Sequence, residues 1–317
     1  MKVTATRQAN LNFRRKVAVP QRIAINAVDN LKKITADFGI LQHEKITQLH
    51  KKSFHSLCDN ALALISACKH YQISADPSFL SMINRYVDFI ELCQLPDGSF
   101  EHTKSDKNIS ENRPAILAEA HGYTIWALGY LIAMQPILPS EVTDRAEFVM
   151  HKAMLHTEKI YSPRAMALII KGLYFYNTTA NSIAVGSLIK TLADRLAQMF
   201  LEGSTKEWQW FDENITLGDS ILPEALLCAY LDTNEYVYKD IAKASFDFLL
   251  LKTFTEFPSN TNKTRIKPSR KTSDVVNMIL ALSKFFGYFK ENYYLSKINS
   301  AYGRFSDHQH YEGMRVA

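Results

Sequence analysis

Cysteine pairs, metal-binding motifs and long apolar runs are missing from this 317-residue sequence. The four cysteines occur singly, with no Cys-x-x-Cys pair and no histidine at a zinc-binding spacing: Cys58, Cys68, Cys93 and Cys228. The N-terminal region has no apolar run typical of a signal peptide, and the longest apolar stretch, 122–138, is interrupted by Gly129 and Pro136. We therefore expect a cytoplasmic protein without a membrane span, with reduced cysteines and without a bound metal.

A large excess of charge of one sign is also missing. The formal net charge is +5, and basic residues cluster only near the start of the chain and in the segment 262–271. Nucleic-acid binding needs a sustained basic face with a recognisable reader motif, and neither is present. A phosphate-binding Gly-x-x-x-x-Gly-Lys loop and a Gly-x-Ser-x-Gly nucleophile motif are absent as well. We expect no nucleic-acid partner and no cofactor.

What the sequence has in abundance is helical periodicity. The stretch "RIAINAVDNLKKITADF" places Ile23, Ala27, Leu31 and Ile34 on one face of a helix. About eleven such segments follow one another, whereas alternating β-branched runs bounded by turns are lacking. The pattern predicts an all-α chain with an N-terminal extension over 1–20 and a single helical domain over 21–317.

The links between the predicted helices alternate in length. Links after the even-numbered segments are short, while most links after the odd-numbered segments are long, at 39–56, 95–117, 202–218 and 256–272. In a ring of antiparallel helix pairs, alternate links emerge at the same end, so the long loops gather on one rim. The even segments are apolar nearly all round, which is typical of buried helices. We predict an (α/α) toroid whose inner helices begin at the long-loop rim.

Acids and aromatic residues from several segments converge on this predicted rim. Sugars are recognised by aromatic faces beside hydrogen-bonding carboxylates, and glycoside hydrolysis needs one protonated and one ionised carboxyl group. If the chain is catalytic, we expect the acid and the base among four residues: Asp59, Asp212, Glu213 and Asp219. Other rim residues are expected to bind the substrate: Gln42, His43, Asp97, Glu119, His121, Arg164, Trp208 and Trp210.

Each of these residues also has an explanation without function. Asp59 and Asp219 fit helix caps, and Trp208 and Trp210 fit anchors that seat a loop on the core. His121 fits a buried hydrogen-bonded residue, and the "DGSF" segment fits a turn. Two exposed acids roughly 6.5 to 9.5 Å apart across a groove would favour inverting hydrolysis. Tryptophans packed inward and acids paired to arginines would count against an enzyme.

Five stretches carry a family resemblance: "DFGILQHEK", "SLCDNALALI", "PDGSFEH" with "AEAHGYTIWALGY", "YSPRAMALIIKGL" and "WQWFDENITLGDSILPEALL". They resemble the α-helical toroid that is fused to, or encoded beside, bacterial family 4 glycosyltransferases, and that has the six-hairpin glycosidase-like architecture. The resemblance runs from about Asp37 to about Phe305. It implies a saccharide ligand, glycoside hydrolase-like chemistry if the protein is an enzyme, and a glycosyltransferase as a partner.

The sequence departs from the family pattern at several positions. Cys58 stands where the first of two paired acids is expected, and Leu62 stands where arginine is frequent. Gly218 and Ser220 replace a tyrosine and an asparagine after the Trp-rich segment. A sixth inner helix is not found, which predicts an incomplete six-hairpin barrel, either open or completed by a partner or a second copy.

Three hypotheses therefore remain open. The first is a carbohydrate-active toroid that binds or hydrolyses a saccharide at the rim. The second is a non-catalytic scaffold or partner of a glycosyltransferase in polysaccharide or glycoconjugate metabolism. The third, a terpenoid cyclase-like toroid, lacks the Asp-rich diphosphate motif and ranks last.

Overall fold

The computed structural model describes residues 55–104, 114–255, 272–298 and 300–301, together with the short pieces 35–36, 39–40 and 266–267. The first predicted helix, near Arg22, and the candidate residues Gln42 and His43 lie outside the described residues. Extended structure in the described ranges is limited to two-residue strands. The strand pairs are β1 (Thr35–Ala36) with β2 (Gly39–Ile40), β3 (His55–Ser56) with β4 (Thr103–Lys104), and β5 (Ile215–Thr216) with β6 (Ile266–Lys267).

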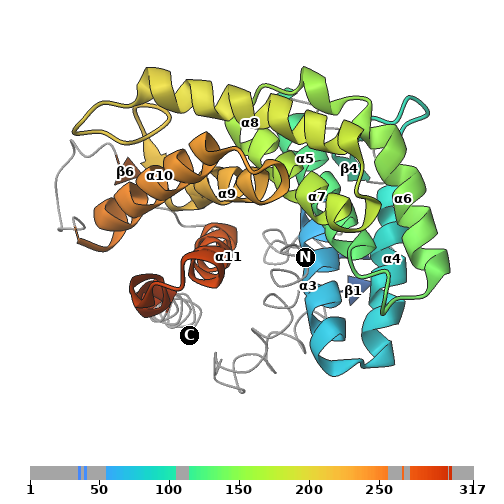
Figure 1. Cartoon of the computed structure of the whole chain (residues 1–317). Helices are drawn as coiled ribbons and strands as arrows, with labels where there is room; N and C mark the ends of the chain where they lie inside the picture. The colour runs from blue at the N-terminus through green and yellow to red at the C-terminus, as the bar shows by residue number, and fades with distance from the viewer. Residues whose placement is uncertain are drawn as a thin grey trace, which may run out of the picture.

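Helices make up nearly all of the rest, which confirms the all-α prediction. Figure 1 shows the inner helices following one another round an arc, with the outer helices outside them. The inner helices are α3 (Leu57–Ser74), α5 (Pro114–Ile132), α7 (Pro163–Ala180), α9 (Ile221–Thr233) and α11 (Thr272–Phe289). The outer helices are α4 (Pro77–Cys93), α6 (Ser140–Met154), α8 (Ile183–Gly203) and α10 (Tyr236–Thr255). Residues 292–298 are also helical.

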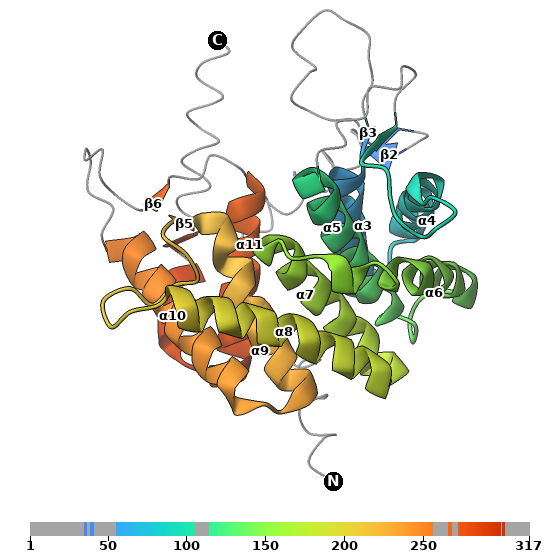
Figure 2. The same cartoon turned by 90° about the horizontal axis from the view of Figure 1, so that it is seen from above.

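Each inner helix packs on the next inner helix and on the outer helix that follows it in the chain. Figure 2 shows the same arrangement from above, with α3, α5, α7, α9 and α11 again in sequence. Between α8 and α9 lies the short 3₁₀ helix η4 (Leu217–Ser220), and η3 (Thr157–Lys159) precedes α7. Inner and outer helices therefore alternate along the chain, as the alternating loop lengths predict.

Three of the short links use the same turn. Ala75, Asn181 and Asn234 each have positive φ, of 54°, 49° and 60°, at the end of α3, α7 and α9. The N–H of each donates to the carbonyl four residues earlier, which satisfies a group that the helix end leaves open. Each turn is followed at once by an outer helix, so these residues set the sharp reversal within a hairpin.

The closest approach of two inner helices is between α5 and α7, where glycines face one another. A Cβ on Gly129 would lie 2.0 Å from the Gly172 carbonyl oxygen, and a Cβ on Gly172 would lie 2.3 Å from the Ile125 oxygen. Only glycine permits this distance between the two backbones. The glycines therefore set the spacing of α5 and α7, and with it the positions of the side chains above them.

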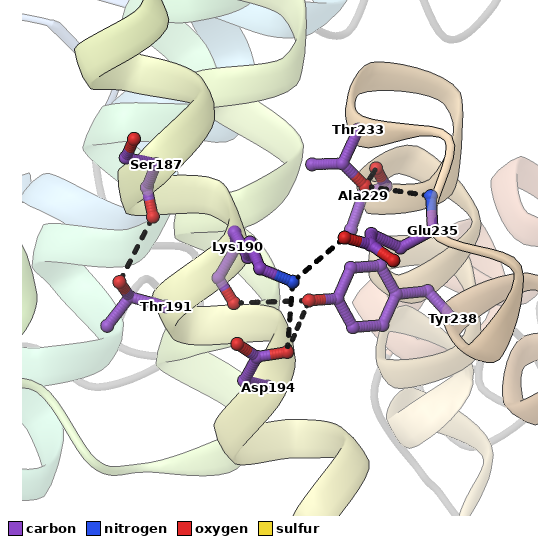
Figure 3. Close-up of polar contacts among 8 residues, drawn as sticks. All are labelled: Ser187, Lys190, Thr191, Asp194, Ala229, Thr233, Glu235 and Tyr238. Atoms are coloured by element: carbon purple, nitrogen blue, oxygen red, sulfur yellow. Dashed lines mark hydrogen bonds and ion pairs between the residues drawn. The ribbon is translucent and has the colours of Figure 1, made fainter.

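The outer helices α8 and α10 are linked by side chains at the surface (Figure 3). Lys190 Nζ lies 3.1 Å from Glu235 Oε1 and 3.9 Å from Asp194 Oδ1. The Tyr238 hydroxyl donates to Asp194 and lies 3.4 Å from the Lys190 carbonyl oxygen. Exposed pairs of this kind contribute little to stability, so we assign them to orienting the helices. No helix among the described residues is long and apolar enough to cross a bilayer.

Candidate functional site

Arg164 is the centre of a charged cluster at the start of the inner helices. It follows Pro163, the first residue of α7, whose fixed φ suits the start of a helix. The guanidinium Nη1 donates to Asp219 Oδ1 at 2.8 Å, Nε lies 3.4 Å from Glu119 Oε1, and Nη2 lies 3.9 Å from Asp274 Oδ1. Four elements therefore meet at one arginine: α5, α7, η4 and α11. We call Arg164 and its three carboxylates, Glu119, Asp219 and Asp274, the Arg164 cluster.

Asp219 has a structural role and a place in this cluster at the same time. Its Oδ2 accepts hydrogen bonds from the Thr216 N–H at 2.9 Å and the Thr216 hydroxyl at 2.7 Å, in a capping box for η4. Burial by itself lowers the pKa of Arg164, but the charges of Asp219 and Glu119 raise it above its ordinary value. The guanidinium is thus permanently charged and leaves part of its surface, 27%, open to solvent.

Gly218 is part of this packing. A Cβ at Gly218 would lie 2.2 Å from Asp274 Oδ1 and 2.9 Å from Arg164 Nη1. The family resemblance places a tyrosine at this position, and no side chain could be accommodated there without moving the cluster. The Asp274 carboxylate fills the space that a side chain at position 218 would need. This explains why glycine stands at a position where the family pattern has tyrosine.

Beneath the Arg164 cluster lie two buried polar residues, Tyr123 of α5 and Asn277 of α11, which are 5% and 1% exposed. Burial raises the pKa of Tyr123, against the opposing effect of the positive charge of Arg164. The Nδ2 atom of Asn277 lies close enough to the Tyr123 hydroxyl to lower its pKa, but no acceptor among the described residues is placed to complete a well-formed hydrogen bond with it. A buried donor of this kind is rare in native proteins and is one that a bound hydroxyl group could satisfy.

Cys58 and His102 form a contact that the sequence does not reveal, because 44 residues separate them. The Cys58 Sγ atom lies 3.9 Å from His102 Nδ1. The pairing of β3 with β4 holds them together, and the Leu57 N–H donates to the His102 carbonyl oxygen at 2.8 Å. Cys58 is close enough to Tyr123 to influence its pKa, so this pair borders the Arg164 cluster. Asp59 lies in the same first turn, where its N–H donates to Ser56 Oγ.

His121 and Asp97 belong to a different group. Helix α5 begins at Pro114, earlier than the expected start near residue 118, so Glu119 and His121 lie in its second turn. Side chains two residues apart on a helix point about 200° apart, and only Glu119 faces Arg164. The His121 ring lies 5.6 Å from Phe100, and burial lowers its pKa to about 4.

The "DGSF" turn forms as predicted and packs on α6. Asp97 Oδ1 accepts the Ser99 N–H at 3.0 Å and the Ser99 hydroxyl at 2.7 Å. His156 Nε2 lies 2.7 Å from the Asp97 carbonyl oxygen, and the rings of His121 and His156 are 6.5 Å apart. A Cβ on Gly98 would lie 2.5 Å from the Lys152 carbonyl oxygen. These contacts fix the loop to the outer ring, away from the Arg164 cluster.

The Trp-rich loop is anchored by its aromatic residues. Trp210 is 1% exposed, whereas Trp208 is partly exposed and packs edge-on against Phe248 of α10 at 5.2 Å. The Trp208 Nε1–H donates to the Asp212 carbonyl oxygen at 2.6 Å. Asp212 and Glu213 are exposed, and no ion pair within the described chain joins either one to Arg164. Trp210 packed inward and Asp219 paired to Arg164 match part of the outcome that counts against an enzyme, whereas Trp208 stays partly exposed.

The structure thus brings together three of the predicted site residues, Glu119, Arg164 and Asp219, and adds Asp274. It keeps Asp97 and His121 in one separate group and Asp212 with the two tryptophans in another. Among the described side chains, no group of three or more His, Cys, Asp or Glu is arranged to hold a metal ion.

No family model and no curated protein matches the sequence. Solved structures do match the fold. D-mannose isomerase is similar with a TM-score of 0.59 and 14% identity, covering 79% of this chain and 75% of that one. Cellobiose 2-epimerase from Bacillus thermoamylovorans B4167 has a TM-score of 0.63 and 12% identity, covering 89% and 87%. A sugar epimerase from a ruminal bacterium has a TM-score of 0.64 and 11% identity, covering 96% and 87%. These similarities show that the chain has the (α/α) toroid fold.

Proposed function

We propose that this chain is a carbohydrate-active protein that binds a saccharide at the Arg164 cluster. The observation that carries the proposal is the convergence of four elements on one partly exposed guanidinium, with carboxylates around it and an unsatisfied amide donor below. The similar structures support it, because all three named above are sugar isomerases or epimerases.

The chemistry of the cluster suits sugar hydroxyl groups. A hydroxyl both donates and accepts, so it can donate to Glu119 or Asp219 while it accepts from Arg164. Asn277 Nδ2 offers a further donor that binding would satisfy. A neutral, hydroxyl-rich ligand can use all of these groups without adding charge to a cluster that already contains one cation and three anions.

A specific observation favours proton transfer over hydrolysis as the reaction of the bound saccharide. Moving a proton at the carbon next to a sugar carbonyl needs a base that titrates near neutral pH, and imidazole is such a group. His102 lies at the border of the cluster, in contact with Cys58. Two-acid hydrolysis instead needs one carboxyl group that is free to be protonated, whereas Glu119 and Asp219 are both paired with Arg164.

The alternative is a non-catalytic saccharide-binding partner of a glycosyltransferase, which the family resemblance implies. The inward Trp210 and the paired acids are compatible with it. Saccharide binding without turnover is the property that distinguishes this alternative from the enzyme.

Proton NMR in D₂O with the full chain tests these possibilities together. D-mannose, cellobiose and longer oligosaccharides are incubated with the wild type and with His102→Gln, which removes the imidazole. Deuterium incorporation at the carbon next to the carbonyl, reduced about 100-fold or more in His102→Gln, supports proton transfer. New reducing ends indicate hydrolysis. Broadened sugar signals without either change indicate binding only, and no effect on any sugar signal contradicts the proposed function.

A further inference from the structure

Three lysines on three different inner helices form a second polar group inside the ring. They are Lys69 of α3, Lys171 of α7 and Lys284 of α11. Each ammonium group lies over an aromatic ring: Lys69 Nζ is 4.9 Å from the centre of Tyr130, Lys171 Nζ is 3.7 Å from Trp126, and Lys284 Nζ is 4.4 Å from Tyr174. The rings attract the charges but supply no counter-charge.

One carboxylate lies among these three cations. Glu224 of α9 pairs with Lys171 at 2.7 Å, and both residues are buried, at 4% and 0% exposed. In the part of the chain that the structure describes, neither Lys69 nor Lys284 has an ion pair. The group therefore contains three ammonium groups against one carboxylate, and an uncompensated charge in such surroundings is costly.

The environment of Lys69 reflects this imbalance. Burial lowers its pKa to about 8, and the positive charges of Lys171 and Lys284 lower it further, against the attraction of Glu224. Burial also raises the pKa of the Cys68 thiol beside Lys69 and of the Cys228 thiol beside Lys284, so both thiols are neutral at pH 7 and add no negative charge. Burial by itself lowers the pKa of Lys284, but Cys228, Tyr174 and Glu224 raise it above its ordinary value. The side chain of Lys69 is only partly buried, so solvent reaches it, as it reaches Lys284.

Helix dipoles do not explain the lysines. Cations are favoured at helix C-termini only within the last turn, and no basic residue occupies the last turn of α3, α7 or α11. Lys171 lies seven residues after Arg164, about 10 Å along the helix. The buried Trp126 lies against Lys171, and among the described residues no ion pair joins this group to the Arg164 cluster.

We propose that Lys69, Lys171 and Lys284 form a binding site for an oxyanion, the phosphate or carboxylate group of a small molecule. Lys69 and Lys284 contact the anion, and Lys171 contributes charge from the position in which Glu224 holds it. A doubly charged anion would balance the two excess cations. This site goes beyond the saccharide site and does not depend on it.

The test is thermal unfolding of the full chain with increasing inorganic phosphate, and separately citrate, with sodium chloride keeping the ionic strength constant. We expect a saturable rise in the melting temperature of the wild type. Lys69→Met and Lys284→Met should each weaken the anion about tenfold or more, because each removes a charged contact. Lys190→Met, which removes an exposed lysine of α8, is the matched control and should respond like the wild type.

Without added anion, Lys69→Met should be more stable than the wild type near pH 7, because it removes a repelled cation. The pKa of Lys69 is lower in the folded chain than in the unfolded chain, so the unfolded state binds more protons between about pH 8 and 10.5. Stability of the wild type relative to Lys69→Met should therefore rise across that range. A response to phosphate alone or to citrate alone identifies the anion group. No saturable response to either one, or equal responses in wild type, Lys69→Met and Lys284→Met, would overturn the proposal.

Discussion

At the scale of single residues, Arg164 determines what the mouth of the ring can bind. Three carboxylates from three elements face it, and the closest, Asp219, is held by its own helix cap. Because the cap fixes Asp219 before any ligand arrives, the guanidinium is oriented in advance. A preorganised donor of this kind loses little entropy on binding.

Gly218 provides the sharpest residue-level prediction. Gly218→Ala places a methyl group 2.2 Å from Asp274 Oδ1, so Asp274 or Arg164 must move. We expect a loss of about 1–3 kcal/mol in the free energy of unfolding, the usual cost of overpacking. Urea denaturation measures it. The neighbouring Ser220→Ala is the control, because it removes a buried hydroxyl for which the described residues offer no hydrogen-bond partner, and it should be neutral or slightly stabilising. Equal stability of Gly218→Ala and the wild type would show that the cluster is not tightly packed.

The sequence indicates which residues lie at the rim but not which of their side chains contact one another. Arg164, Glu119 and Asp219 were predicted because each lies near the start of an inner helix. Asp274 has the same position, but no motif singles it out. The sequence predicts His121 to lie with them because the expected start of α5 is about one turn too late. A helix start known only to within a turn does not show which face of the helix a side chain occupies. Cys58 and His102 meet through strand pairing, for which two-residue strands leave no sequence pattern.

At the scale of helices, the contact between α5 and α7 controls the spacing of the inner ring. Gly172→Ala would place a Cβ 2.3 Å from the Ile125 carbonyl oxygen, a backbone atom that cannot turn away. We expect a loss of about 3 kcal/mol or more on urea denaturation. Gly287→Ala, in α11, is the control, since no atom of the described residues lies within 4 Å of the added Cβ; it should gain up to about 1 kcal/mol from helix propensity. A Gly172→Ala protein as stable as the wild type would contradict this account of helix spacing.

Helices were the best-predicted elements because apolar periodicity and turn residues act locally. The described part of the chain contains the nine helices α3 to α11 and the further helical residues 292–298, and the order of inner and outer helices follows from the alternating links. The inward direction of Trp210 could not be predicted, because the period-two spacing of Trp208 and Trp210 fits either orientation.

At the scale of the whole molecule, the ring separates two kinds of site. The Arg164 cluster lies at the starts of the inner helices and is rich in carboxylates. The lysine group lies deeper and is rich in cations. The same ring thus holds a carboxylate-rich site near the helix starts and a cation-rich site below it. Variants of one site should leave ligand binding at the other unchanged.

Calorimetric titration of the full chain with D-mannose, cellobiose and longer oligosaccharides is the most direct test of the central claim. The account predicts saturable binding of at least one of them. Affinity should fall about tenfold or more in Arg164→Met and in Glu119→Gln, which changes charge but not shape, and should stay unchanged in Lys69→Met. Absence of binding to any of these saccharides, or wild-type affinity in both rim variants, would contradict the assignment of the Arg164 cluster as a saccharide site.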